Sequence, residues 1–320
     1  MKSRKLTEAA MLSALFVVIS IIAIGTGIAY SLYLDMVVPI LLALIYFKCD
    51  LKYTILSAGT SLIIVMLIYG NVASGLYMIQ SMLMGIVCGV LIKKDTTILD
   101  DLFYCGLFGC IVMILIDIYF SGILGYSFIK EAEGYLEYIP YNEEMKKVVF
   151  YISVAAIPLG TIFITYFVSL ILGKKLKILD KVGMKKFTLI KNFRKFGNLI
   201  CCSNKTTNIG IGYLLIIAIL RMAGVLEFHK YFEILFTSME YTVLYFLISD
   251  SFKFVPKDIY KRTKSRLAFF VSEVIILFLL VNQFRITTSI LILYSYIVNK
   301  KYDIRNTQIK MINNNIIKYI

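Results

Sequence analysis

Charged residues are scarce in this 320-residue chain: they make up 17% of it, whereas hydrophobic residues make up 59%. No water-soluble fold could bury this much apolar surface, but a lipid bilayer accepts it as the outer face of a helix bundle. The composition therefore excludes an ordinary soluble globular protein. It predicts an all-α, polytopic transmembrane helix bundle in the cell (plasma) membrane.

Histidine is scarcer still, since His229 is the only one. A zinc site normally gathers four ligands, and His229 is expected on the opposite side of the membrane from Cys201 and Cys202. The chain also lacks the glycine-rich loop of ATP-hydrolysing proteins, the Gly-x-Ser-x-Gly turn and the His-Glu-x-x-His pair. We therefore expect no metal, no cofactor and no enzyme activity, and any ATP hydrolysis would belong to another subunit.

Long apolar stretches fill the chain from end to end. Crossing the ~30 Å hydrocarbon layer takes about 20 apolar residues, and we predict about ten membrane helices. Eight is the fallback count, because the last two stretches are short and could form a hairpin that does not cross fully. The predicted helices are Leu6–Ile24, Ser31–Phe47, Tyr53–Tyr69, Val72–Ile92, Leu102–Leu124, Val148–Leu172, Ile209–Leu226, Tyr231–Phe252, Leu267–Val281 and Ile286–Val298.

Lys and Arg residues are concentrated in alternate links between these stretches. Of the 34 basic residues, 28 fall on one side of the predicted topology, and basic residues stay on the cytoplasmic side in short loops. Both termini and the link Lys174–Lys205 are therefore predicted to be cytoplasmic, and the acidic link Gly125–Lys147 is predicted to be outside. The net charge of +14 is interpreted as a topology signal rather than nucleic-acid binding. Attraction of the basic loops to anionic lipids would be a by-product.

The hydrophobic pattern breaks near the middle of the chain. We predict a six-helix membrane unit at 1–173, a basic cytoplasmic link at 174–208, a C-terminal four-helix membrane unit at 209–298 and a basic cytoplasmic tail at 299–320. Within the link, Lys185–Lys195 interleaves basic and apolar residues, as in a helix that lies in the membrane interface. A solvated basic loop is the alternative.

Small residues recur at four-residue spacing in two of the predicted helices. This spacing lets helix backbones approach closely in a membrane. Ala10 and Ala14 in the first helix either pack inside the bundle or dock a partner, whereas Gly85 and Gly89 in the fourth are interpreted as internal packing.

Ionisable residues inside a membrane cost about 2.5–3.5 kcal/mol each on insertion scales, so each needs an explanation. A short outer link joins the helices that carry Arg221 and Glu240, and Glu233 lies near it. We expect an ion pair of Arg221 with one of these two acids. Snorkelling of Arg221 to the interface is one alternative, and a substrate or proton role is another.

Asp117 has no obvious local partner in the outer part of the fifth helix. Asn71 and Tyr119 are expected near its depth. One hypothesis is a polar, substrate-binding pocket open to the outside that contains these three residues. The other is a carboxylate solvated at the membrane edge.

Three short segments carry a family resemblance: the opening Lys5–Leu15, the central Phe193-Arg-Lys-Phe196 and the closing Tyr302-Asp-Ile-Arg305. They resemble the landmarks of the YybS-like uncharacterised membrane proteins. The first six helices resemble S components, the substrate-binding subunits of energy-coupling-factor transporters. In that family an Ala-x-x-x-Ala face docks the transmembrane coupling subunit, and Ala10 and Ala14 match this face.

The resemblance implies a membrane protein related to transporter substrate-binding subunits. The leading hypothesis is therefore a substrate-capture or transport subunit for a small molecule that works with a separate coupling and ATPase partner. The alternative is a membrane assembly or scaffold protein that binds lipids or envelope proteins. An intramembrane enzyme is disfavoured, because no nucleophile or metal set accompanies acids such as Glu240.

Overall fold

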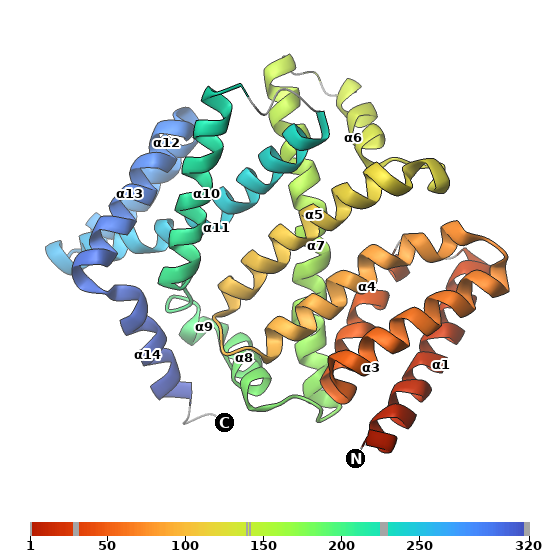
Figure 1. Ribbon diagram of the computed structural model, residues 1–320. Helices are drawn as coiled ribbons and strands as arrows, with labels where there is room; N and C mark the ends of the chain where they lie inside the picture. Colours follow the sequence, from red (N-terminus) through yellow and green to blue (C-terminus); the bar gives the residue numbers. More distant parts are fainter. Residues whose placement is uncertain (1, 28–31, 139, 141, 225–229, 317–320) are drawn as a thin grey trace.

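The computed structural model describes residues 2–27, 32–138, 140, 142–224 and 230–316, and these residues form helices and no strand (Figure 1). His229 lies outside the described residues, as do the start of one predicted helix (Ser31) and the end of another (Val225 and Leu226). The helices are α1 (Lys2–Thr26), the π-helix η1 (Tyr33–Val37), α3 (Val38–Tyr69), α4 (Val72–Lys93), α5 (Ile98–Leu124), α6 (Phe128–Glu137), α7 (Glu143–Lys175), α8 (Lys181–Lys191), α9 (Phe193–Phe196), α10 (Asn204–Met222), α11 (Lys230–Thr263), α12 (Arg266–Asn282), α13 (Phe284–Tyr302) and α14 (Ile304–Ile316).

Every predicted membrane stretch overlaps one of these helices. Seven helical segments of the described residues are long and apolar enough to cross a membrane, which confirms the multi-pass helical character. The 17-residue α12 and the more polar α13 are not among the seven. In Figure 1 the α1 start and the α14 end lie at the same end of the molecule, near α8, and α6 lies at the other. We call these the α8 end and the α6 end.

One of the seven segments, Tyr33–Tyr69, crosses the bundle twice. A continuous helix of 37 residues would be about 55 Å long, yet both of its ends reach the same turn of α1. The Tyr33 hydroxyl lies 2.5 Å from Ser20 Oγ, and the Tyr69 hydroxyl donates to the Ile21 carbonyl at 2.5 Å. The chain reverses at Asp50, which has φ 70° and ψ 168°. Within the described residues, the seven segments therefore make eight passes.

Close backbone contact joins α3 and α4. A Cβ atom at Gly85 would lie 2.2 Å from the Pro39 carbonyl oxygen, so only glycine permits this approach. Gly89 is similarly close to Ala43, where a Cβ atom would lie 3.3 Å from Cα. The small face of α4 is thus used for packing inside the bundle.

The two predicted membrane units share a hydrophobic core. Phe103 of α5 and Tyr166 of α7 belong to the same buried cluster as Phe246 of α11. The Phe103 and Phe246 rings meet edge to face, with centroids 5.8 Å apart. The predicted units 1–173 and 209–298 therefore pack directly on one another.

The basic link is folded onto the bundle rather than solvated, because α8 inserts the side chain of Lys186, which is 2% exposed. Its Nζ donates to Asp101 Oδ2 at 2.6 Å and to the carbonyls of Leu91 and Lys94 at 2.8 and 2.6 Å. All three ammonium donors are thus satisfied. Burial lowers the pKa of Lys186 below its ordinary value, and the adjacent Asp101 opposes this shift.

A second buried ion pair fastens the C-terminal tail at the same end. Arg305 is 1% exposed and donates to Asp250 Oδ2 from Nε at 3.1 Å and from Nη2 at 2.8 Å. The backbone N–H of Cys202, in the link, donates to Asp250 Oδ1 at 3.1 Å. Asp250 therefore joins the link, α11 and α14.

Candidate functional site

A cavity of about 310 Å³ lies near the α6 end, between η1, α4, α5 and the start of α6. We call it the α6-end cavity. The polar residues that line it include Asp35 of η1, Tyr77, Gln80 and Ser81 of α4, and Asp117 of α5. Such polar groups are costly within apolar helices unless they serve a structure or a ligand.

Asp117 supports the structure of this cavity. It is 4% exposed, so it is not a carboxylate solvated at the membrane edge. Its Oδ1 accepts from the Phe128 backbone N–H at 2.7 Å and its Oδ2 accepts from the Ser127 hydroxyl at 2.9 Å. Both donors belong to the first turn of α6, where a negative charge is favoured by the helix dipole. Asp117 therefore holds α6 against the cavity.

Asp35 is an acidic cavity residue that the sequence analysis did not identify, and Gln80 and Ser81 were not identified either. The Asp35 carboxylate forms no ion pair within the described residues, whereas Asp101 pairs with Lys186 and Asp250 pairs with Arg305. It lies on the π-helix η1, and π-helical turns occur often at functional sites. The available signal was an acidic residue inside the predicted helix Ser31–Phe47, close to its outer end.

The structure does not bring Asn71 and Tyr119 into this cavity. The Asn71 side chain caps α4 by accepting from the Ala73 N–H at 2.9 Å. Tyr119 is 71% exposed on the outer surface of α5. Two residues beyond Asp117, it is rotated by about 200° around the helix, so depth alone did not predict its direction.

Arg221 meets one of its two predicted acidic partners. Its Nη2 lies 2.6 Å from Glu240 Oε2, with side-chain exposures of 52% for Arg221 and 20% for Glu240. Glu233 instead accepts from the Tyr151 hydroxyl at 2.7 Å. Glu233, in the first turn of α11, does not pair with the guanidinium, because its side chain faces Tyr151 of α7.

Ala10 and Ala14 are both exposed on the outer surface of α1. A neighbouring surface of the helix packs inward, where Ser13 Oγ lies 2.7 Å from Ser61 Oγ. The alanine pair is thus not used for packing within this chain. It is open to lipid or to another protein.

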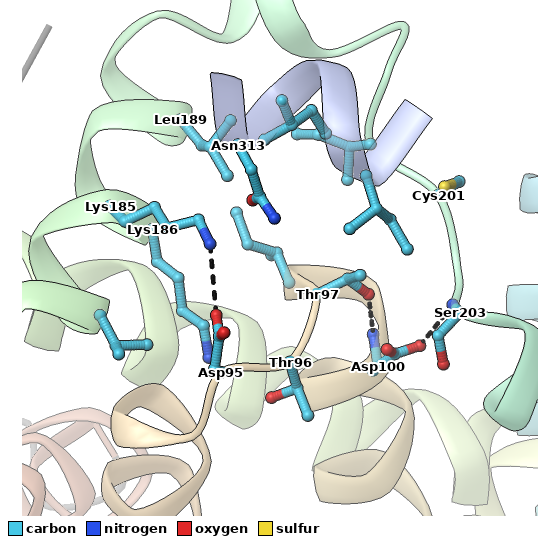
Figure 2. Close-up of a pocket in the computed structure, with 15 residues that line it drawn as sticks. Asp95, Thr96, Thr97, Asp100, Lys185, Lys186, Leu189, Cys201, Ser203 and Asn313 are labelled. Atoms are coloured by element: carbon cyan, nitrogen blue, oxygen red, sulfur yellow. Dashed lines mark hydrogen bonds and ion pairs between the residues drawn. The ribbon is translucent and has the colours of Figure 1, made fainter. Parts of the chain in front are cut away.

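A second cavity, of about 270 Å³, lies at the α8 end between the α4–α5 link, α8 and α14 (Figure 2). Ile98, Leu189 and Ile312 contribute to its largely apolar wall. The Asp100 side chain at its edge accepts from the Ser203 N–H at 2.9 Å, and Lys185 Nζ lies 3.2 Å from Asp95 Oδ1. These charged groups are engaged with protein partners, which makes the α6-end cavity the better candidate site.

The cysteines do not form a metal centre in the part of the chain that the structure describes. No group of three or more His, Cys, Asp or Glu side chains there is arranged to hold a metal ion. All six cysteines are free and buried. Burial raises the pKa of the Cys202 thiol well above its ordinary value, so this thiol stays neutral.

Sequence comparison supports the class of protein that the fold defines. The family model of a predicted membrane protein (DUF2232) matches residues 14–139, which is less than half of the chain. Of the residues that line the α6-end cavity, all but Ile157 fall within this range. Neither the curated proteins nor the solved structures gave a match. The chain is a multi-pass integral membrane protein with an all-helical fold.

Proposed function

We propose that this protein is a substrate-capture subunit that binds a small polar molecule in the α6-end cavity. The observation that carries the proposal is the exposed carboxylate of Asp35, which lines this cavity and forms no ion pair within the described residues. Gln80 and Ser81 add hydrogen-bonding groups to the same wall. Polar groups at a few positions of a mostly apolar cavity are typical of small-molecule sites.

The proposed orientation places this cavity on the outer side of the plasma membrane. The basic links and both termini then face the cytoplasm, in keeping with the distribution of Lys and Arg. Anionic lipids are the expected partners of these basic links. The resemblance to YybS-like proteins and to S components is consistent with this arrangement, in which transport would need a separate coupling and ATPase partner.

Mass spectrometry of metabolites bound to the protein purified from native membranes tests the capture role. We expect a small molecule in the wild-type sample that is strongly reduced in Asp35→Asn and in Gln80→Leu. Tyr119→Phe is the matched control, since its exposed side chain lies outside the cavity. Equal small-molecule content in all four proteins would contradict the proposal. An envelope protein that copurifies without any small molecule would favour the assembly role instead.

The exposed pair Ala10 and Ala14 is the proposed docking face for the coupling partner. Small side chains one turn apart leave a shallow groove for a second helix. We expect the double change Ala10→Leu and Ala14→Leu to abolish copurification of that partner while the melting temperature of the isolated chain stays unchanged. Loss of stability would show internal packing, and an intact complex would exclude this face as the docking site.

A further inference from the structure

A long apolar groove lies where α11 and α12 pack beside α7. It has a volume of about 690 Å³ and lies between α7, α11 and α12, and we call it the α11 groove. Ala156 and Gly160 of α7 leave one side open, and a Cβ atom added at Gly160 would meet no other atom within 4 Å. Leu277 and Leu280 of α12 form the other side.

The length of the α11 groove matches one leaflet of a bilayer. Along α11 it extends from Tyr241 to Lys253, which is roughly 18 Å at ~1.5 Å per residue. Half of the ~30 Å hydrocarbon layer is about 15 Å. A transmembrane helix of a partner would need a surface about twice as long, whereas a lipid acyl chain fits a groove of this extent.

A basic side chain, that of Lys253, lies at the end of the groove nearer α8. Lys253 lines it and is half-buried, and no carboxylate within the described residues forms an ion pair with it. The nearby Asp250 is already paired with Arg305 at 2.8 Å. Lys253 also begins the basic stretch Lys253–Arg266, which has the character of a segment at the membrane surface. The remainder of the groove is almost entirely apolar.

We propose that the α11 groove is a specific site for an anionic phospholipid of the leaflet at the α8 end. One acyl chain lies between α7 and α12 over the floor formed by α11, and the headgroup phosphate contacts Lys253. Apolar burial along the groove holds the chain, and the charge of Lys253 selects an anionic headgroup. This site is separate from the α6-end cavity and does not depend on its ligand.

Native mass spectrometry of the full-length protein in detergent, with equal amounts of dioleoyl phosphatidylglycerol and dioleoyl phosphatidylcholine, tests the site. We expect a preference of about fivefold for phosphatidylglycerol, the size expected for one lysine at a membrane surface. Lys253→Gln should bring this preference close to one. Lys300→Gln, which removes an equal charge from an exposed position in α13, should leave it unchanged.

A second pair of variants tests the groove itself. Gly160→Leu should lower retention of both lipids several-fold because its side chain fills the acyl-chain space, and Ala156→Val provides a milder version if the leucine protein fails to fold. Equal effects of Lys253→Gln and Lys300→Gln on the lipid preference would show that it comes from general charge attraction, and would overturn the site. Unchanged lipid retention in folded groove variants would also overturn the site. So would the finding that a membrane protein copurifies with the wild type in a one-to-one ratio and is lost from these variants, because that protein would then occupy the groove.

Discussion

Replacing Arg305 with methionine is expected to destabilise the protein strongly. The guanidinium donates twice to Asp250 and once to Ser295 Oγ at 3.0 Å, and it lies 4.7 Å from the centre of the Phe254 ring. Both members of the ion pair have side-chain exposures of 1%. The change therefore leaves the Asp250 carboxylate buried with only the Cys202 N–H as a recorded hydrogen-bond donor.

Removing one member of a buried ion pair costs about 3–5 kcal/mol, because the other charge remains without a partner. At roughly 2 °C per kcal/mol for a chain of this length, the melting temperature in detergent should fall by about 6–10 °C. Adding Asp250→Asn removes the stranded charge and keeps an oxygen acceptor for Cys202. The double variant should therefore regain part of the loss.

Thermal unfolding of the wild type, both single variants and the double variant in one detergent completes this double-mutant cycle. Arg4→Met is the matched control, because Arg4 pairs with Glu8 on the exposed surface of α1 and should give no measurable shift. Strictly additive effects of the Arg305 and Asp250 changes would refute the coupling. So would an Arg305→Met shift as small as that of the control.

Two further predictions concern the ion pair near the α6 end and the topology. Glu240→Gln should lower the melting temperature and Arg221→Met should partly restore it, whereas Glu233→Gln and Arg221→Met should be additive. Equal coupling of Glu233 and Glu240 to Arg221 would contradict the observed pairing. No coupling of either acid to Arg221 would also contradict it and would favour snorkelling of Arg221. In a cysteine-free background, a cysteine at the exposed position Tyr138 should react with an impermeant maleimide in intact cells, and one at the exposed position Lys191 should react only after lysis. Labelling at position 191 in intact cells would overturn the orientation.

The sequence predicted the helical membrane segments well because their cause is local. In lipid, every backbone polar group must be satisfied within its own segment, so a long apolar stretch becomes a helix wherever it occurs. The predicted Val72–Ile92 is α4 (Val72–Lys93), and the predicted Leu102–Leu124 is the later part of α5 (Ile98–Leu124). The apolar pattern found these segments without knowledge of their neighbours.

The pattern of charges was less informative about the candidate sites. It assigned Lys186 to a helix at the membrane interface or a solvated loop, and the structure buries this side chain against Asp101, 85 residues earlier in the chain. Asp117 was predicted to be near Asn71 and Tyr119 because all three share a depth. Depth does not determine which side of a helix a residue faces, and only Asp117 lines the α6-end cavity.

Composition and the spacing of apolar and basic residues by themselves determined that this chain is a multi-pass helical membrane protein, since length, hydropathy and charge act segment by segment. Tertiary structure alone decided that Asp117 accepts from the first turn of α6, that Lys186 is buried against Asp101 and that Arg305 pairs with Asp250. Each of these features depends on two segments that meet only after the helices pack. A buried charge is tolerated where a partner from another helix compensates it, and no local pattern identifies that partner.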